Sequence, residues 1–348
     1  MANIKDVARE AGVSVATVSR VFNDSGLVSE DTRRAVREVA ERLNYWPNGV
    51  ARSLITNRTH AVGVLLPDLH GEFFSEVIRG IDLTARRVGL HLLVSSSHSD
   101  HGELIAALRS MRGRIDGLVV MAPDVDAHDA LRLVAGHFPV VVLDPGSGSH
   151  DFHTISIANA QGAHAVTSHL VALGHRHIAT ITGPERNTDA RERLEGYRGA
   201  LRDARIEPRA ELEIPGDFTE RSGYEAAARL LALSPRPTAV FAGNDNMAIG
   251  LMSALSDLGV QVPGDLAVSG FDDIALARYV SPPLTTVHVD AFHLGERSVE
   301  MLSGILGPAP IVPLPSHELL RTRLVVRASC GAPSAEGADP RGARRLEP

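Results

Sequence analysis

The chain has 348 residues, of which 44% are hydrophobic and 22% charged, and its formal net charge is -7 at pH 7. No apolar run approaches the ~20 residues of a membrane-spanning helix, the opening MANIKDVARE lacks the apolar stretch of a secretory signal, and the single cysteine, Cys330, excludes an intrachain disulfide framework. We therefore expect a cytoplasmic protein of two or three domains, with no part in the membrane.

The charge is unevenly distributed along the chain. Residues 1–60 hold nine Lys/Arg and seven Asp/Glu, whereas the remaining residues hold 26 bases and 35 acids. A mildly basic head on an acidic body is typical of a small module that faces an anion and is joined to another domain.

Three short stretches at the start of the chain carry apolar residues at helical spacing. They are IKDVAREAG (4–12), SVATVSRVF (14–22) and SEDTRRAVREVAERLN (29–44). Ser14 and Ser29 stand where a helix needs an N-cap. The buried face of the third stretch would consist of Ala35, Val36, Val39, Ala40 and Leu43. We expect a small all-α domain over residues 1–46.

Ala8, Gly12 and Val18 have the spacing of a helix-turn-helix. Gly12 permits the positive φ of the tight turn, and Val18 fills the angle between the helices. The same spacing can arise in any small three-helix bundle, which is the structural alternative. In a DNA reader, the second helix would contact base edges through Val15, Ala16 and Arg20. Phosphate contacts would come from Ser14, Thr17, Ser19, Asn23, Ser29 and Thr32.

The stretch YWPNGVARSL, residues 45–54, has the pattern of a helix that is too short to be stable by itself. Such a segment needs an external surface to become ordered. We therefore expect a hinge helix and linker over residues 47–59.

From about residue 60 onward, apolar strands alternate with amphipathic helices, as in AVGVLLP, DGLVVMA, PVVVLDP, HIATITG and TAVFAGN. This pattern is typical of parallel sheets covered on both faces. The strands are too many for one sheet of ordinary size, so we expect two doubly wound subdomains within 60–330. The limits are about 60–158 with 291–317 for the first, and about 159–290 with 318–328 for the second. Residues 331–348 are rich in Gly, Pro and Ala, and we expect a disordered tail.

Ligands of parallel-sheet domains bind beyond the carboxyl ends of the strands. The residues at those positions are Phe73, Phe74, Asp144, Arg193, Phe218, Asn244, Asp245 and Asp272. Carboxylates, an amide and a guanidinium around aromatic faces suit a polyhydroxylated small molecule. Asp245 and Asp272 have a structural alternative, because either carboxylate can cap the helix that follows it.

Enzyme and metal sites have weaker support. No G-x-G-x-x-G or P-loop follows the first strand, and the nearest match to a nucleophile elbow, GVSVA, contains the helix cap Ser14. The histidine pairs in HSDH and HRH lie in loops without a matching set of carboxylates or cysteines. We expect no enzymatic activity, no cofactor and no metal.

The segments IKDVAREAGVSVATVSRVFN, VSEDTRRAVREVAERLNYWPNGVARSL, GHRHIATITG, FAGNDNMAIG, VSGFDD and PPLTTV resemble the LacI/GalR family of transcriptional regulators over roughly residues 3–327. The resemblance implies a two-subdomain body of periplasmic-binding-protein type. It implies a hinge helix that forms on operator DNA, with Leu54 and Ala51 in the minor groove and Asn48 near the backbone. It also implies effector contacts by Arg193, Asn244 and Asp272, with Phe74 and Phe218 as stacking faces.

The same resemblance implies a homodimeric repressor of a pseudo-palindromic operator, controlled by a small molecule in the cleft between the subdomains. The combination of Asn244 with Asp272 is similar to the sugar-responsive members, and a purine effector is the alternative. Asp144 precedes Pro145, where many relatives carry a charged residue. The tail lacks the heptad helix of the tetrameric relative, so we expect dimers. A periplasmic sugar-binding protein would share the body but has no use for the head.

Overall fold

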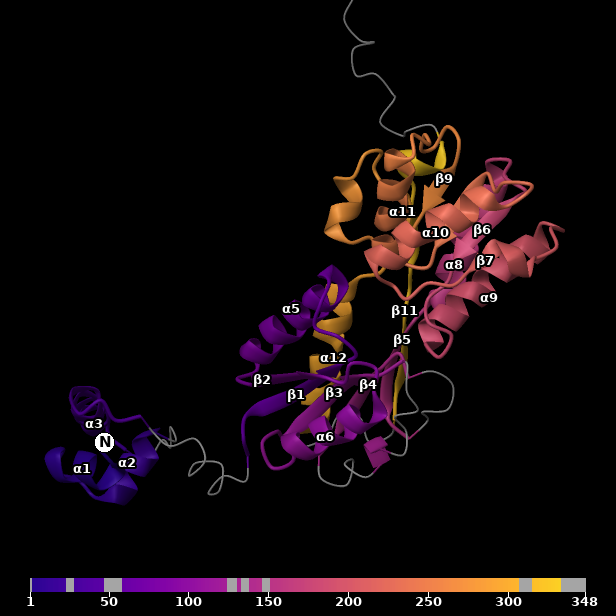
Figure 1. The fold of residues 1–348 in the computed structure, drawn as a ribbon. Coiled ribbons are helices and arrows are strands. Elements are labelled where there is room, and N and C mark those ends of the chain that lie inside the picture. The colour runs from indigo at the N-terminus through magenta and orange to yellow at the C-terminus, as the bar shows by residue number, and fades with distance from the viewer. Residues whose placement is uncertain are drawn as a thin grey trace, which may run out of the picture. The chain divides into compact units, whose positions relative to one another are not determined.

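The computed structural model describes residues 2–22, 28–46, 58–123, 130–132, 138–145, 151–306 and 315–332. The chain divides into two compact units, residues 1–60 and 61–348. Figure 1 shows both units.

The first unit consists of α1 (Ile4–Glu10), α2 (Val15–Phe22) and α3 (Glu30–Arg42). Its core is formed by Val7, Ala8, Val18, Val21, Val36, Val39 and Ala40. Gly12 has a φ of 64°, as the tight turn between α1 and α2 requires. Val18 is fully buried between the helices. The predicted all-α head with a helix-turn-helix is confirmed.

For one residue of the head, the prediction that it belongs to the core is wrong. Ala35 is exposed, although its neighbour Val36 is fully buried. Successive residues of an α-helix point about 100° apart, so Ala35 falls just outside the apolar stripe that faces α1 and α2.

The second unit contains two parallel sheets and one small antiparallel pair. The six-stranded sheet has the order β11-β5-β4-β3-β1-β2 and the four-stranded sheet the order β7-β6-β8-β9. The strands of the first are β1 (Ala61–Leu66), β2 (His91–Ser96), β3 (Gly117–Met121), β4 (Val140–Leu143), β5 (His153–Ile157) and β11 (His317–Leu320). Those of the second are β6 (Ile178–Ile181), β7 (Glu213–Ile214), β8 (Ala239–Ala242) and β9 (Ala267–Ser269). β10 (Thr286–His288) pairs with β12 (Arg323–Val325) in antiparallel fashion.

Helices cover both sheets. The first sheet carries α5 (Glu72–Arg87), α6 (His101–Met111) and α12 (Ala291–Leu306), and the second carries α8 (Asn159–Ala172), α9 (Thr188–Asp203), α10 (Glu220–Ala232) and α11 (Asp245–Asp257). Figure 1 shows α5 beside α12, although some two hundred residues separate them. Their backbones approach closely, since a Cβ on Gly80 would lie 2.0 Å from the Phe292 carbonyl oxygen. The predicted architecture of two doubly wound subdomains is confirmed.

The chain crosses between the two sheets three times. The first crossing follows β5, and the second lies between β10 and α12. β11 pairs with β5 in the six-stranded sheet through Leu320, so the last crossing falls a few residues after the boundary of about 317 that the sequence predicts. The local sequence pattern does not reveal this boundary, because the end of β11 is set by its pairing with β5, which lies more than 150 residues earlier in the chain. Within the described ranges, no helix has the length and apolar character to cross a membrane.

Candidate functional site

The outward face of α2 is the first candidate site. Val15, with 41% of its surface exposed, lies beside the exposed Ala16 and Arg20. Ala16 and Arg20 are four positions apart and so lie on one side of the helix, and Val15 is exposed next to Ala16 at the start of α2. An apolar side chain on such a face can contact the methyl group of a thymine. The exposure of Val15 therefore fits a recognition surface.

Two hydroxyl pairs flank this face. Ser14 Oγ accepts a hydrogen bond from the Thr17 amide at 3.0 Å and lies 2.9 Å from the Thr17 hydroxyl. Ser29 and Thr32 repeat the arrangement at the start of α3, with a hydroxyl separation of 2.9 Å. Both pairs sit at helix N-termini, where the helix dipole favours a phosphate group. Ser19 is half-buried on α2. Asn23, Asn48, Ala51 and Leu54 lie outside the described residues.

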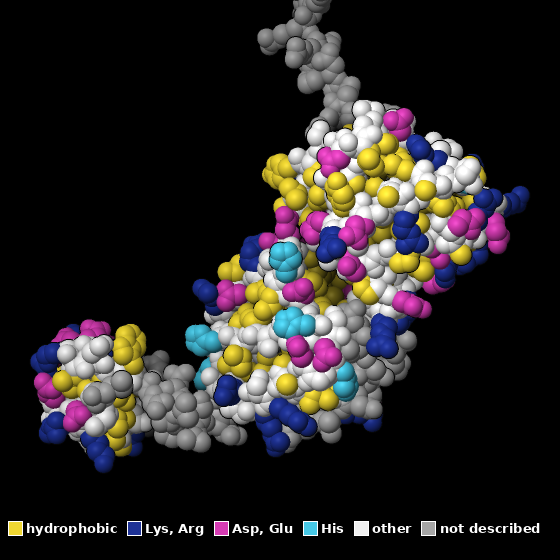
Figure 2. Space-filling view, in the orientation of Figure 1, with side chains coloured by type: hydrophobic (Ala, Val, Ile, Leu, Met, Phe, Trp, Pro, Cys, Tyr) yellow, Lys and Arg dark blue, Asp and Glu magenta, His cyan; other side chains and the backbone are white. Residues whose placement is uncertain are grey.

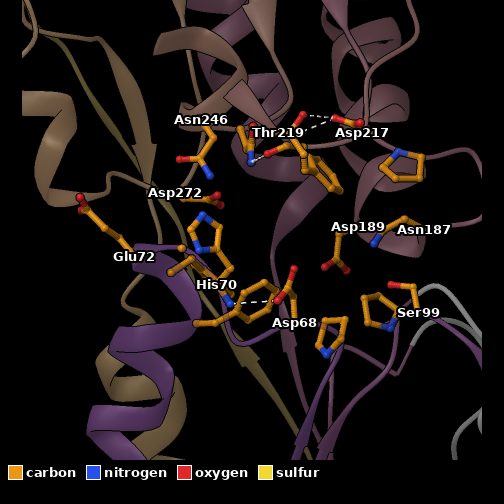
Figure 3. Close-up of a pocket in the computed structure, with 18 of the residues that line it drawn as sticks. Asp68, His70, Glu72, Ser99, Asn187, Asp189, Asp217, Thr219, Asn246 and Asp272 are labelled. Atoms are coloured by element: carbon orange, nitrogen blue, oxygen red, sulfur yellow. Dashed lines mark hydrogen bonds between the residues drawn. The ribbon is translucent and has the colours of Figure 1, made fainter. Parts of the chain in front are cut away.

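The second candidate site is a cavity of about 230 Å³ in the body, at the carboxyl ends of strands from both sheets. Figure 3 shows Asp217, Thr219 and Asn246 on one side of it and Asp68 on another. The sequence-predicted residues in its lining are Phe73, Phe74, Arg193, Phe218, Asn244 and Asp272. The volume lies just below the several hundred Å³ of pockets for drug-sized ligands, and it suits a molecule the size of one sugar ring.

Arg193 is the centre of the polar network. Its side chain is 7% exposed and forms an ion pair with Asp272, with 3.2 Å between Nη2 and Oδ1. Nε donates to Asn159 Oδ1 at 2.9 Å, and Nη1 donates to the Gly243 carbonyl at 2.7 Å. The guanidinium also lies 3.8 Å from the centroid of the Phe271 ring. A buried guanidinium needs such partners, because an unpaired charge away from water is costly.

A hydrogen bond between Asn244 and Phe218 holds both residues in place at the cavity. Asn244 caps α11 through the Met247 amide at 3.0 Å, and its Nδ2 donates to the Phe218 carbonyl at 2.9 Å. Phe218 has a φ of 69°, in the left-handed region. Its ring covers Gly183, where a Cβ would come within 2.2 Å of Phe218 Cζ. The aromatic face therefore depends on a glycine in the loop after β6.

Burial raises the pKa of Asp272 to about 6, and the nearby Arg193 opposes that rise. Oδ1 of Asp272 has no well-aligned hydrogen bond within the described part of the chain. The carboxylate thus retains an acceptor for a ligand hydroxyl, even though it is paired with Arg193.

Two other candidate carboxylates bind the backbone. Asp144 is not among the lining residues; its Oδ1 accepts the Ile157 amide at 3.0 Å and so ties the end of β4 to β5. Asp245 Oδ2 accepts the Ile274 amide at 2.9 Å, and Oδ1 accepts the Thr286 hydroxyl at 2.5 Å. Burial raises the pKa of both carboxyl groups well above the usual range. Their contacts are those of structural groups.

The cavity also has polar residues that sequence reasoning missed. They are Asp68, His70, Glu72, Ser99, Asn187, Asp189, Asp217, Thr219, Glu220 and Asn246. Most of them follow β1, β2, β6 and β7 within a few positions, so the rule on strand ends would have found them if it had been applied to every loop.

The two sides of the cavity touch in this structure. Glu72 Oε2, at the start of α5, accepts the Leu276 amide at 3.3 Å, and the Thr188 amide donates to the Pro123 carbonyl at 3.0 Å. Each contact joins a residue of the six-stranded sheet's subdomain to one of the other subdomain. No set of three or more His, Cys, Asp or Glu side chains within the described ranges is arranged to hold a metal ion.

Two family models match the chain: bacterial regulatory proteins of the lacI family over residues 3–48, and a periplasmic binding protein-like domain over residues 167–330. The chain is 41% identical over 307 residues to the HTH-type transcriptional repressor PurR of Proteus mirabilis, covering 87% of this chain and 89% of that protein. It is 39% identical over 306 residues to the ribose operon repressor of Escherichia coli K12, covering 87% and 92%.

Among solved structures, the lac repressor dimer bound to operator and the anti-inducer ONPF superposes with a TM-score of 0.86 at 33% identity, covering 95% of this chain and 99% of that one. The similarity extends through head and body, and it confirms the resemblance found in the sequence. The chain therefore belongs to the lacI family of bacterial regulatory proteins, which are DNA-binding transcriptional regulators and not enzymes.

Proposed function

We propose that this chain is a repressor that binds a pseudo-palindromic operator as a homodimer and responds to a monosaccharide in the cavity of its body. The observation that carries the effector part is the ion pair of Arg193 with Asp272 among the phenylalanines of the lining. Planar polar groups can each bridge neighbouring hydroxyls, while aromatic faces pack on the apolar side of a sugar ring.

The head supports the DNA-binding part of the proposal. Val15, Ala16 and Arg20 are exposed on α2, and no hydrogen bond or ion pair of the Arg20 side chain is found within the described ranges. A guanidinium that is left available in this way can contact guanine O6 and N7.

Coupling between the two sites follows from a two-state equilibrium. A ligand that binds one closure of the body more tightly than another shifts the equilibrium toward that closure. Operator affinity then changes by the same coupling free energy, whichever ligand binds first. The contacts from Glu72 to Leu276 and from Thr188 to Pro123 are formed in the closure seen here and are the kind that such a shift makes or breaks.

A purine effector is the second candidate. Relatives at 40–41% identity are repressors named PurR, and the faces of Phe73, Phe74 and Phe218 could also stack on a flat base. The ribose operon repressor at 39% identity and the polar lining favour the sugar.

Operator binding is tested on a duplex selected from a random pool by the full-length protein. Arg20→Ala should lower affinity for the selected duplex at least tenfold and relax its preference at one base pair, because a base contact is lost. Arg34→Ala, which changes an exposed arginine of α3 that is paired with Asp31, is the matched control. Unchanged affinity and preference for Arg20→Ala would contradict the assignment.

The hinge is tested separately. Leu54→Ala should leave the fold intact and weaken operator binding at least tenfold at matched salt, because an apolar wedge in the minor groove is lost. Ala51 and Asn48 belong to the same proposed contact. Gel-shift affinity equal to that of the wild type would reject the proposal for Leu54.

Effector binding is tested by thermal unfolding with a panel of sugars and nucleosides. A ligand that binds only the folded state raises the melting temperature in proportion to its affinity and concentration. Arg193→Ala should abolish the shift. Arg202→Ala, on the exposed side of the same helix, should keep it. A shift that survives in Arg193→Ala would place the effector elsewhere.

A homodimer is proposed from the lac repressor dimer and from exposed apolar side chains on the body. These include Leu83, Leu276 and Tyr279, the last of them 80% exposed. Sedimentation of the full-length protein at micromolar concentration should give a dimer, and a monomer or a tetramer would contradict this.

A further inference from the structure

Four helices begin at the effector cavity. The cap residues Gly71, Asn187, Thr219 and Asn244 all belong to its lining. Helix N-termini carry a partial positive charge and free amides, which is how many proteins bind phosphate. By backbone geometry alone, this cavity would therefore be expected to bind an anion.

In three of these helices, however, one amide of the first turn is already bound by the side chain of the cap residue, whereas α5 begins at Gly71 without such a cap. Asn187, Thr219 and Asn244 each accept a hydrogen bond from an amide in the first turn of their own helix, at 3.0–3.2 Å. Each cap removes a donor that a phosphate would need.

In three of the four helices the first turn also carries a carboxylate that lines the cavity, whereas the first-turn carboxylate of α11 is that of Asp245, which binds the Ile274 amide. Glu72, Asp189 and Glu220 occupy these positions in α5, α9 and α10 and line the cavity. Acidic residues at such positions stabilise the helices themselves. Their second effect is on the cavity, because the partial positive charge of each N-terminus is offset by a full negative charge.

Acidic groups outnumber basic ones in the whole lining. Among the described residues, the lining carboxylates are those of Asp68, Glu72, Asp189, Asp217, Glu220 and Asp272, and the one guanidinium is that of Arg193. All of them lie within roughly a Debye length, about 8–10 Å, of a ligand that fills the cavity. Figure 2 shows Asp and Glu side chains around the hollow between the two lobes of the body.

Arg193 cannot compensate for this excess. Three of its five N–H donors are directed at Asn159, Gly243 and Asp272. A phosphate that approached the guanidinium would meet the carboxylate of Asp272, which is only 10% exposed and therefore poorly screened. Oδ1 of Asp272 faces Nη2 of Arg193 at 3.2 Å without a well-aligned hydrogen bond. A carboxylate oxygen has two lone pairs, so it can also accept a hydroxyl or an ammonium group.

We infer that the cavity excludes anions, so that the effector is a monosaccharide without a phosphate or carboxylate group. An amino group in place of a hydroxyl is accepted at least as well as the parent sugar. The inference rests on the proposed effector site and narrows the class of molecule that the site takes. It excludes phosphorylated sugars and nucleotides.

Calorimetric titration of the full-length protein at pH 7.5 tests this. The probes are the common aldopentoses and aldohexoses, their 2-amino-2-deoxy analogues, their phosphate esters and the uronic acids. At least one uncharged sugar should bind, and its phosphate ester should bind at least tenfold more weakly. A phosphate ester or uronic acid that binds as tightly as its parent overturns the inference. So does a panel in which no uncharged sugar and no amino sugar binds.

Variants separate charge from shape. The ratio of interest is the affinity for the parent sugar divided by the affinity for its phosphate ester. Glu220→Gln should lower this ratio toward one, and added salt should lower it too. Glu225→Gln lies on the same helix but outside the lining, and it should leave the ratio unchanged. If the affinity ratio is the same in Glu220→Gln as in the wild type, the shape of the cavity alone excludes the ester, which contradicts the inference.

Operator gel shifts in the presence of each ligand distinguish this inference from the proposed function. A phosphate ester that binds and alters operator affinity overturns the inference and leaves the proposed function in place. An uncharged sugar that binds without altering operator affinity leaves the inference in place and contradicts the proposed coupling.

Discussion

At the scale of single residues, Arg193 connects parts of the body that are far apart in the sequence. It donates to Asn159 at the first crossing, to the backbone at the end of β8, and pairs with Asp272 after β9. Removal of the guanidinium would leave a buried carboxylate without its counter-charge. The effect of Arg193→Ala on ligand binding is therefore a loss of cavity shape as well as a loss of direct contact.

The pH dependence of effector binding follows from Asp272. Its pKa is raised to about 6 by burial, so the group is a carboxylate above that pH and takes up a proton below it. A ligand hydroxyl that donates to the carboxylate favours the ionised form. Effector affinity should therefore fall as the pH is lowered from 7.5 to 5, measured by calorimetry.

Asp272→Asn provides the control for this pH dependence. The variant should bind more weakly at pH 7.5, because a charge-assisted hydrogen bond is replaced by a neutral one, and should lose most of the decline toward pH 5. Wild-type affinity that stays constant over this range would show that Asp272 does not accept from the ligand as its carboxylate.

Gly183 controls the aromatic face. A Cβ at this position would lie 2.2 Å from Phe218 Cζ, so Gly183→Ala should displace the ring and weaken effector binding about tenfold. Gly199→Ala in α9 is the control, because its Cβ would meet only His164 at 3.5 Å and alanine is favoured in a helix by about 1 kcal/mol. Equal effector affinities for the two variants would contradict the role of Phe218.

At the scale of elements, the helices of this chain begin at side-chain caps that the sequence makes visible. Ser14, Ser29, Asn187, Thr219 and Asn244 each accept an amide of the following turn. In the head the capped ends face the side that we propose binds phosphate, whereas in the body they surround the cavity. The electrostatic setting differs between α2 and the cavity, because the first turn of α2 carries no acidic residue, whereas acidic first-turn residues of α5, α9 and α10 line the cavity.

Two variants of Ser14 distinguish its role as a helix cap from its proposed contact with a DNA phosphate. Asp and Asn cap a helix about as well as Ser, so both Ser14→Asp and Ser14→Asn should keep thermal stability within about 0.5 kcal/mol of the wild type. Only Ser14→Asp places a negative charge against the DNA backbone. Its operator affinity should fall at least tenfold below that of Ser14→Asn, and equal affinities would exclude a phosphate near this residue.

At the scale of the whole molecule, one buried carboxylate contacts two of the connections between the two sheets of the body. The side chain of Asp273 is 1% exposed and contacts Arg327 at 2.5 Å and His288 at 3.0 Å. His288 lies in β10 and Arg327 follows β12. Asp273 therefore links the loop after β9 to the two strands that lie next to the second and third crossings between the sheets. The preceding residue, Asp272, lines the cavity. The proposed ligand contact of Asp272 is therefore next in the chain to the ion pairs of Asp273.

Asp273→Asn tests this junction. A broken buried ion pair typically costs 3–5 kcal/mol, so the variant should unfold at a clearly lower denaturant concentration. Asp203→Asn, which alters a pair that is 75% exposed on the aspartate side, should change stability by less than about 1 kcal/mol. A loss in Asp273→Asn no larger than in Asp203→Asn would contradict the structural role.

The amino-acid sequence alone predicts the kinds of elements and their order. Caps, a turn glycine and helical spacing are local, so they defined α1–α3, while continuous apolar runs defined the parallel strands. Because ligands bind at the carboxyl ends of parallel strands, the same reasoning reached Arg193, Asn244 and Asp272 before any contact was known.

Which of these side chains face the cavity depends on contacts that form when the chain folds. Asp144 stands at a strand end like the others, yet its carboxylate binds the Ile157 amide, and Asp245 turns to Thr286 and Ile274. The end of β11 and the position of Phe218 over Gly183 likewise depend on residues 35 to more than 150 positions away. Periodicity and capping act within a few residues, whereas the choice between a ligand and a backbone amide is made by groups that meet only when the chain has folded.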